Sequence, residues 1–347
     1  MKTKLKKMAA YLPGLIASLG IAAVASFIES LLPIHVVGAA VLAMFIGMAF
    51  EPLVKRAPIM KVGIKLTSKK VLKLAIILLG LSLNIMTVLN VGRMSLVVMV
   101  FTLATCFGCG YFVGKALGLN WKMSNLISAG TGICGGSAIA AIAPTIEADD
   151  RDIAFAMSAT FLFDMAMIIL FPIMGKALGM SDQAFGLWAG TAVNDTSSVV
   201  ATGYAFSEAA GDFATMVKLT RTLAIIPTVL VFALIQLRIK RREALAEAKD
   251  TKEIKTNFSI KKVFPWFILG FLAMTAVASI FAIPTEAVAI TKKISKFLMV
   301  AALAAIGMST SFSSFKKSGA RPMLHGFIIS ALVVVVALLV EMCMGMV

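Results

Sequence analysis

The chain carries Gly130-Thr131-Gly132-Ile133-Cys134-Gly135-Gly136-Ser137 in the middle of one long apolar stretch. A second apolar stretch contains Gly190-Thr191-Ala192-Val193-Asn194-Asp195-Thr196-Ser197-Ser198. Small and hydroxyl-bearing residues of this kind interrupt helices, and interrupted backbone at membrane depth is tolerated only where protein buries it or where it lines a cavity. Interrupted hydrophobic segments are also the best sequence indication of a transporter's substrate site. The two interruptions therefore predict a membrane transporter.

The composition is that of a protein that lies mostly in lipid. Of its 347 residues, 60% are hydrophobic and 14% are charged, whereas soluble domains have about 25% charged residues. The formal net charge is +16, and its lysines and arginines fall in short loops, which the positive-inside rule explains better than nucleic-acid binding does. Of the 4 cysteines, Cys106 and Cys109 have CxxC-like spacing, but they lie in an apolar segment with no second pair or histidine nearby. Neither a disulfide framework nor a metal site is therefore predicted.

Apolar stretches of membrane-crossing length predict an all-α polytopic membrane protein with about eleven transmembrane helices. The predicted crossings are 11–29, 34–50, 71–89, 93–115, 123–146, 153–175, 184–206, 213–236, 263–283, 294–314 and 323–345. Basic residues gather in every second connection, and the acidic run after residue 146 falls in one of the others. This sorting predicts a cytoplasmic N-terminus and a basic cytoplasmic linker at 237–262. Lys292 and Lys293 go mildly against it.

Two short internal similarities have the same offset of about five crossings. Lys122-Met123-Ser124-Asn125-Leu126 matches Lys293-Ile294-Ser295-Lys296-Phe297, and Val71-Leu72-Lys73-Leu74 matches Met216-Val217-Lys218-Leu219. They predict two inverted repeats of five helices, 34–176 and 177–347, with 1–33 as an extra helix. The tenth crossing, with Gly307-Met308-Ser309-Thr310-Ser311, is then the partner of the fifth. As discontinuous crossing helices, the two would point positive N-terminal ends at a central anion.

The candidate substrate-binding residues are the small and polar ones of these segments. They are Thr131, Gly132, Cys134, Gly135, Gly136, Ser137, Asn194, Thr196, Ser197, Ser198, Ser309 and Thr310. Close helix packing is the alternative role for the glycines, and helix capping is the alternative for Asn194 and Asp195.

Charged residues inside the apolar segments are further candidates. Asp195 and Asp164 are expected to couple proton or sodium movement, because burying a carboxylate is expensive and usually functional. Lys218 and Arg221 lie three residues apart on one helix face, which suits the binding of an oxyanion substrate. The alternative is that both cations pair structurally with Asp164 and Asp195.

Three stretches, 130–149, 189–203 and 217–227, resemble those of the YeiH-like family of bacterial membrane proteins, which are named as sulfate exporters. The resemblance extends through most of the chain. It implies a two-repeat fold related to bile-acid symporters and sodium/proton antiporters, with crossing discontinuous helices and a moving core domain. It also implies export of a sulfur oxyanion or organosulfonate across the cytoplasmic (inner) membrane.

The leading hypothesis is a secondary active transporter of a small anion that works by elevator-like alternating access. The runner-up is a cation/proton antiporter that uses the Asn194-Asp195 pair. A channel is a further alternative. An intramembrane aspartyl protease is disfavoured, because its Gly-x-Gly-Asp and Tyr-Asp signatures are missing from the sequence. Because no GxxxxGK phosphate-binding loop is present, we expect that the chain itself does not use ATP. We expect neither an enzyme nor a soluble cofactor. A homodimer is left open.

Overall fold

The computed structural model describes residues 10–31, 39–246, 266–281, 283–310 and 319–347. All regular secondary structure within these ranges is helical, which confirms the predicted all-α class. By length and composition, five of the described helices can cross a membrane: Leu12–Ser30, Ile85–Ala116, Arg151–Ala177, Glu208–Arg242 and Ala320–Cys343. Predictions on the N-terminal lysines, on most of the linker at 237–262 and on Ser311 lie outside the described residues.

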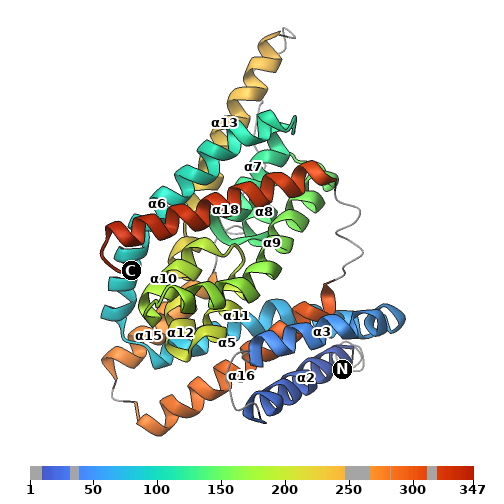
Figure 1. The fold of residues 1–347 in the computed structure, drawn as a ribbon. Helices are drawn as coiled ribbons and strands as arrows, with labels where there is room; N and C mark the ends of the chain where they lie inside the picture. Colours follow the sequence, from blue (N-terminus) through green and yellow to red (C-terminus); the bar gives the residue numbers. More distant parts are fainter. Residues whose placement is uncertain (1–9, 32–38, 247–265, 282, 311–318) are drawn as a thin grey trace.

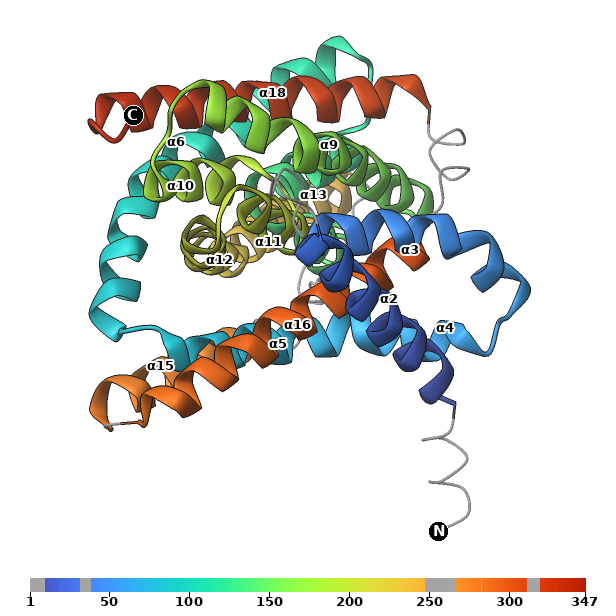
Figure 2. The same ribbon diagram turned by 60° about the horizontal axis from the view of Figure 1, so that its bottom comes forward.

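The helices form two bundles (Figures 1 and 2). The scaffold bundle consists of α2 (Leu12–Leu31), α3 (Ala39–Arg56), α4 (Met60–Leu66), η1 (Thr67–Val71), α5 (Leu72–Leu79), η2 (Gly80–Ser82), α15 (Trp266–Ile280) and α16 (Thr285–Ser309). The core bundle consists of α6 (Ile85–Ala116), α7 (Trp121–Ala129), η3 (Gly130–Cys134), α8 (Gly136–Ile142), α9 (Asp150–Ala177), α10 (Asp182–Ala192), α11 (Thr196–Phe206), α12 (Glu208–Thr222), α13 (Ile225–Ala246) and α18 (Ala320–Cys343). The bundles touch where α11 packs against α3 and α16 and where α15 packs against α6.

Two glycines let the central helices of the scaffold bundle cross closely. A Cβ atom on Gly47 of α3 would lie 2.3 Å from the carbonyl oxygen of Ala304, and one on Gly307 of α16 would lie 2.1 Å from that of Met44. Small residues at helix crossings allow backbones to approach in this way. Gly307 therefore serves helix packing, and α16 continues without a break to Ser309.

Residues 121–142 fold back on themselves, so the prediction that 123–146 crosses the membrane is wrong. α7 leads into the π-helical turn η3, Gly135 adopts a φ of +63°, and α8 returns beside α7. At the open end, Lys122 donates from Nζ to the carbonyl oxygen of Glu147 at 2.7 Å. A continuous helix would separate these two residues by about 37 Å. We call residues 121–142 hairpin 1.

Residues 182–206 also fold back, so the predicted crossing at 184–206 is wrong as well. α10 ends at Ala192, and α11 begins at Thr196 and returns. The rings of Phe185 and Phe206, near the two ends of the segment, stack with centroids 4.0 Å apart. Ser207, directly after α11, donates from Oγ to Asp182 Oδ1 at 2.6 Å. We call residues 182–206 hairpin 2.

The open ends of the two hairpins lie at opposite ends of the core bundle. α12 begins at Glu208, directly after hairpin 2, and α13 carries Lys240, which pairs with Glu147 beside the open end of hairpin 1. The helix pair α12–α13 therefore runs from one open end to the other. We call these ends the Asp182 end and the Lys240 end.

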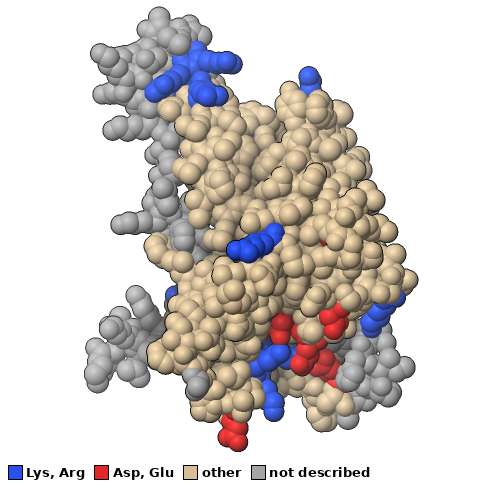
Figure 3. All heavy atoms as spheres, turned by 90° about the vertical axis from the view of Figure 1, so that its left-hand side faces the viewer, with Lys and Arg blue, Asp and Glu red and all other residues tan. Residues whose placement is uncertain are grey.

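Charge is sparse between the two ends. Figure 3 shows one face on which Lys and Arg gather at the top, Asp and Glu lie with Lys and Arg near the bottom, and most of the surface between them is uncharged. The acidic run after residue 146 was expected to lie opposite the basic connections. That expectation is wrong, because Glu147 pairs with Lys240 and Asp152 accepts from Asn120, both at the Lys240 end.

The tight crossing of α3 and α16 leads to a stability prediction. Gly307→Ala should lower the stability of the purified protein, because overpacking of a filled interior costs about 1–3 kcal/mol. The measurement is the thermal unfolding midpoint in detergent. Gly20→Ala is the control, since a Cβ atom there meets nothing within 4 Å. An equal midpoint for the two variants would contradict the proposed packing role.

Candidate functional site

The two hairpins meet at their tips in the interior of the core bundle. Tip 1 comprises residues 130–136 and tip 2 comprises residues 193–196. A Cβ atom on Gly135 would lie 2.8 Å from both Cβ and Oδ1 of Asp195. Glycine at this position therefore supplies the positive φ that the turn requires and also leaves room for tip 2. The sequence predicted both interruptions; the structure shows that they face each other.

Arg221 joins the two tips through backbone carbonyl groups. Its Nε donates to the carbonyl oxygen of Gly132 at 2.6 Å, and its Nη2 donates to that of Thr131. Its Nη1 donates to the carbonyl oxygen of Thr191 and, at 3.4 Å, to that of Val193. The last carbonyls of a helix have no partner within that helix, so one guanidinium satisfies the ends of both inward-running arms.

Lys218, one helical turn before Arg221, binds the C-terminal end of α10, to which Arg221 also donates. Its Nζ donates to the carbonyl oxygen of Val193 at 2.9 Å, and the side chain is fully buried. A cation at a helix C-terminus is stabilised by the partial negative charge there. The two cations thus compensate helix ends. Among the described residues, neither cation forms an ion pair with Asp164 or Asp195. Both bind backbone oxygens, so the alternative of structural pairing is wrong.

Asp164, in the middle of α9, binds the opposite kind of helix end. Its Oδ1 accepts from the backbone N–H of Asn194 at 2.9 Å, and its Oδ2 accepts from that of Asp195 at 2.8 Å. Lys218 and Arg221 had been the candidate partners of this carboxylate under the structural alternative. N–H groups at the start of a helix lack acceptors within that helix. The buried carboxylate of Asp164 supplies acceptors for two of these groups and therefore binds backbone rather than a cationic side chain.

Asp195 is the N-cap of α11, in agreement with the capping alternative. Its Oδ2 accepts from the backbone N–H of Ser197 at 2.9 Å and from the hydroxyl of the same residue. Unlike Asp164, its side chain is half-buried, and so is that of Thr196 beside it. Asp195 is thus a cap that also reaches the surface of the tips.

A further residue at the tips was missed by the sequence analysis. Ser330, in the middle of α18, lies 3.5 Å from Thr131 Oγ1 and accepts from Asn194 Nδ2 at 3.4 Å between the side-chain atoms. It therefore touches both tips. A single serine in an apolar helix is a weak sequence signal, because serine also fits ordinary close helix packing.

Within the described residues, the tips retain one unsatisfied polar side-chain atom and an accessible side. Asn194 Oδ1 is buried and has no hydrogen-bond partner among the described residues, which in a native interior points to a functional role. On tip 1 and the start of α8, Gly136 is half-exposed and Ser137 is exposed, and a Cβ atom on Gly136 would meet nothing within 4 Å. The polar surface at the tips is therefore accessible from the side of Gly136 and Asp195.

The predicted site residues separate into two groups. Those of the two interruptions, with Lys218, Arg221 and Asp164, come together at the tips; Gly132, Cys134 and Ser198 among them are buried. Ser309 and Thr310 do not join them, since their hydroxyls donate to the carbonyl oxygens of Ala305 and Ile306 in their own helix. α16 packs against α3 and α5, so the expected crossing of the fifth and tenth segments is replaced by the meeting of hairpins 1 and 2.

No metal-binding cluster of three or more His, Cys, Asp or Glu side chains occurs in the part of the chain that the structure describes. The polar groups at the tips are instead hydroxyls, amides, carboxylates, backbone groups and the cationic ends of Lys218 and Arg221.

Removal of the Arg221 guanidinium should destabilise the core bundle. Arg221→Met removes the donor to the buried carbonyls of Thr131, Gly132 and Thr191, and each such unpaired group costs about 1–3 kcal/mol. We expect a clear fall in the thermal unfolding midpoint of the purified protein. Arg238→Met, at an exposed position of α13, is the control and should change the midpoint little. A comparable midpoint for the two variants would show that the tips do not depend on Arg221.

Asp164→Asn should also destabilise the protein, because a carboxamide offers one oxygen where two N–H groups now have two. Loss of a hydrogen bond to a charged group costs about 1.5–3 kcal/mol. Limited proteolysis across hairpin 2 measures the effect. Asp149→Asn is the matched control, since Asp149 is exposed and its side chain makes no cap bond. Equal cleavage rates in the two variants would refute the role assigned to Asp164.

The chain is similar to proteins from several bacteria. Residues 13–326 match the family described as "Conserved hypothetical protein 698". A UPF0324 membrane protein of Clostridium tetani is 54% identical, covering 97% of this chain and 98% of the relative. A UPF0324 membrane protein of Streptococcus pyogenes is 40% identical over 99% of both chains, and one of Fusobacterium nucleatum is 40% identical over 84% of this chain and 86% of the relative.

These names describe membrane proteins and specify no substrate, so the resemblance to sulfate exporters stays a prediction. No solved structure matches the chain. The relatives' names and the apolar helices together identify a multi-pass membrane protein. The chain belongs to the family of conserved hypothetical protein 698, whose relatives in other bacteria are named UPF0324 membrane proteins.

Proposed function

We propose that this protein is a secondary active transporter whose substrate site lies at the meeting tips of hairpins 1 and 2. The observation that carries the proposal is that two broken helices meet inside the core bundle and that buried charges compensate their ends. Irregular backbone at membrane depth occurs where it is buried in protein or lines a cavity. Transporters use such half-helix ends as binding sites, and one bundle moves against the other around the site.

An inverted architecture follows as part of the proposal. Hairpin 1 opens at the Lys240 end and hairpin 2 at the Asp182 end, so the two enter from opposite sides. Each is followed by a helix that carries buried charge to the tips, α9 with Asp164 and α12 with Arg221. We infer that these two units are related by an inverted repeat. With the positive-inside rule, the basic Lys240 end is cytoplasmic.

A small anion is the substrate class that we propose, and the resemblance to sulfate exporters favours a sulfur oxyanion or organosulfonate. α8 and α11 both begin at the tips, and the partial positive charge of a helix N-terminus attracts anions. At α11, carboxylates of the protein already accept from the N–H groups of Asn194, Asp195 and Ser197. The hydroxyl of Ser137 and the half-buried Thr196 lie on the accessible side. Asp195, beside them, would repel an anion when ionised, so proton uptake by Asp195 provides a means of coupling.

Cation/proton antiport is the second candidate, and one observation favours it. Lys218 and Arg221 are fully buried and bonded to carbonyls, whereas the Asp195 carboxylate is half-buried. A carboxylate that reaches the surface of the tips suits a site that a cation and a proton occupy in turn.

Proteoliposome transport tests the proposal. Purified protein is reconstituted, and sulfite, sulfate and an alkanesulfonate are offered as concentration gradients. We expect saturable, substrate-gradient-driven flux of at least one of them, and we expect Asp195→Asn to reduce that flux at least tenfold. Asp149→Asn, at an exposed position outside the tips, should leave the flux within twofold of the parent.

The outcomes separate the alternatives. Sodium-dependent proton movement that is indifferent to the anions would favour the second candidate. Flux at channel rates that Asp195→Asn leaves unchanged would contradict both forms of the proposal, because neither rate nor residue dependence would then be that of a carrier working through the tips.

A further inference from the structure

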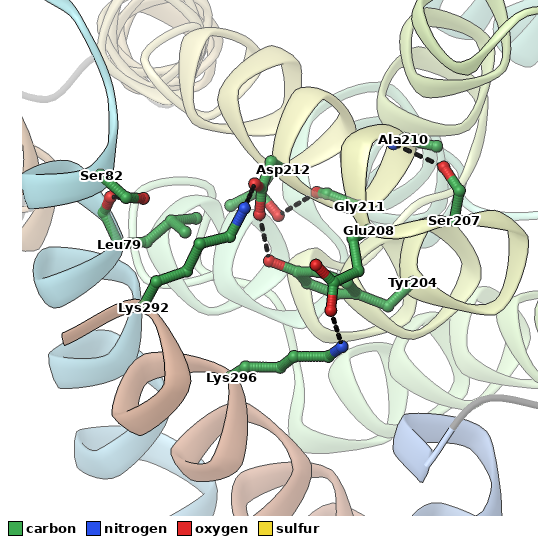
Figure 4. Close-up of polar contacts among 11 residues, drawn as sticks. Leu79, Ser82, Tyr204, Ser207, Glu208, Ala210, Gly211, Asp212, Lys292 and Lys296 are labelled. Carbon is green, nitrogen blue, oxygen red and sulfur yellow. Dashed lines mark hydrogen bonds and ion pairs between the residues drawn. The ribbon is translucent and has the colours of Figure 1, made fainter. Parts of the chain in front are cut away.

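Ion pairs join the two bundles at the Asp182 end. Figure 4 shows Lys292 and Lys296 of α16 directed toward α12. Lys292 Nζ lies 2.7 Å from Asp212 Oδ2, and Lys296 Nζ pairs with Glu208 Oε1. Lys292 was an exception to the charge sorting of the sequence. Its acidic partner on another helix accounts for a lysine at this end.

Hairpin 2 takes part in the same cluster through Tyr204 of α11. The Tyr204 hydroxyl donates to Asp212 Oδ1 at 2.5 Å, and Lys296 Nζ lies 5.9 Å from the centroid of the Tyr204 ring. The returning arm of the hairpin, the start of α12 and α16 are thus connected by one group of polar contacts. A displacement of the core bundle along the scaffold bundle would have to break these contacts.

The partners are exposed to different degrees: Asp212 is buried, Lys292 and Lys296 are half-exposed, and Glu208 is exposed. The relative side-chain exposures are 37% for Lys292 and 11% for Asp212, and 35% for Lys296 and 63% for Glu208. Exposed and half-exposed ion pairs are weak and are screened by salt. These pairs therefore suit a contact that forms and breaks, in contrast to the fully buried Arg221.

The interface beneath the ion pairs contains a small cavity within an otherwise apolar contact. A cavity of about 10 Å³, the space of about one water molecule, lies between the bundles. It is lined by Glu29, Ala39, Ala40, Val200, Tyr204, Lys296, Met299 and Val300. Val200 is fully buried in this arrangement. Its exposure therefore reports whether the two bundles have separated at this end.

We propose that the Lys292–Asp212 and Lys296–Glu208 pairs form a releasable latch, which holds hairpin 2 and α12 against α16 and closes the interface between the bundles at the Asp182 end. The latch rests on the movement of the core bundle contained in the proposed function. Its test measures the accessibility of the interface and requires no transported substrate.

The experiment uses Val200→Cys in the full-length protein as a reporter. The purified protein is treated with a charged, membrane-impermeant thiol reagent, and the labelling rate is measured by mass spectrometry on the peptide that contains position 200. Lys296→Glu places two carboxylates opposite each other and should raise this rate at least fivefold. Adding Glu208→Lys to the same chain restores opposite charges and should return the rate to within twofold of the reporter alone.

Lys293→Glu is the matched control, because Lys293 lies on the same helix, is exposed and forms no ion pair with a described residue. It should leave the labelling rate unchanged. Restoration by the charge-swapped pair also excludes misfolding as the cause of a rise. The latch is refuted if Lys296→Glu leaves the rate within twofold of the reporter alone, or if the swapped pair does not restore it.

The result can be distinguished from the fate of the proposed function. A protein that carries no tested solute in proteoliposomes, but shows the expected labelling pattern, would overturn the transport proposal and keep the latch. A protein that transports but labels equally in all variants would overturn the latch and keep the transport proposal.

Discussion

The hydrogen bonds from the Arg221 guanidinium to backbone carbonyls of two separate hairpins are the interaction on which the core bundle depends. Each hairpin stops a helix inside the protein and leaves carbonyl groups without partners. Buried and unpaired, those groups would each cost about 1–3 kcal/mol. One fully buried side chain satisfies carbonyls of Thr131, Gly132 and Thr191 at once. Asp164 does the same for N–H groups at the start of α11.

This arrangement divides the polar residues of the interior by task. Arg221, Lys218 and Asp164 are committed to backbone groups and hold the tips in place. Asp195 and Ser137 lie nearer the accessible side, where a solute would meet them. Contacts between the two bundles at the Asp182 end are of a third kind, because each joins a half-exposed lysine to a carboxylate of the other bundle. The fully buried contacts at the tips and the partly exposed contacts between the bundles are thus separated in space.

The sequence allowed prediction of the helical class and of the two interruptions, because small and hydroxyl-bearing residues in apolar segments are unusual enough to stand out. It did not reveal that the chain turns back at each one. An apolar stretch such as 123–146 is long enough to cross the membrane once or to go halfway and return. Hydropathy shows the length of an apolar segment but not whether the chain reverses within it. The contact between Lys122 and Glu147 that decides the matter is tertiary.

The candidate site was predicted in part for a similar reason. The residues of both tips were identified, but the partners of the buried charges were not, because every residue has a carbonyl and only the fold shows which carbonyls are unpaired. Ser309 and Thr310 were included through a short sequence similarity. In the structure, Gly307 beside them serves the close crossing with α3, a use of glycine that sequence alone does not distinguish from a helix break.

The sequence separation of these contacts has a consequence for biosynthesis. Arg221 follows its partner Gly132 by 89 residues in the chain, so the ribosome completes hairpin 1 long before the guanidinium that satisfies its tip exists. During that interval the tip carbonyls need water or another protein as partners. Hairpin 1 must therefore remain near an aqueous surface or beside the insertion machinery until α12 arrives, and its final depth in the bilayer is set late.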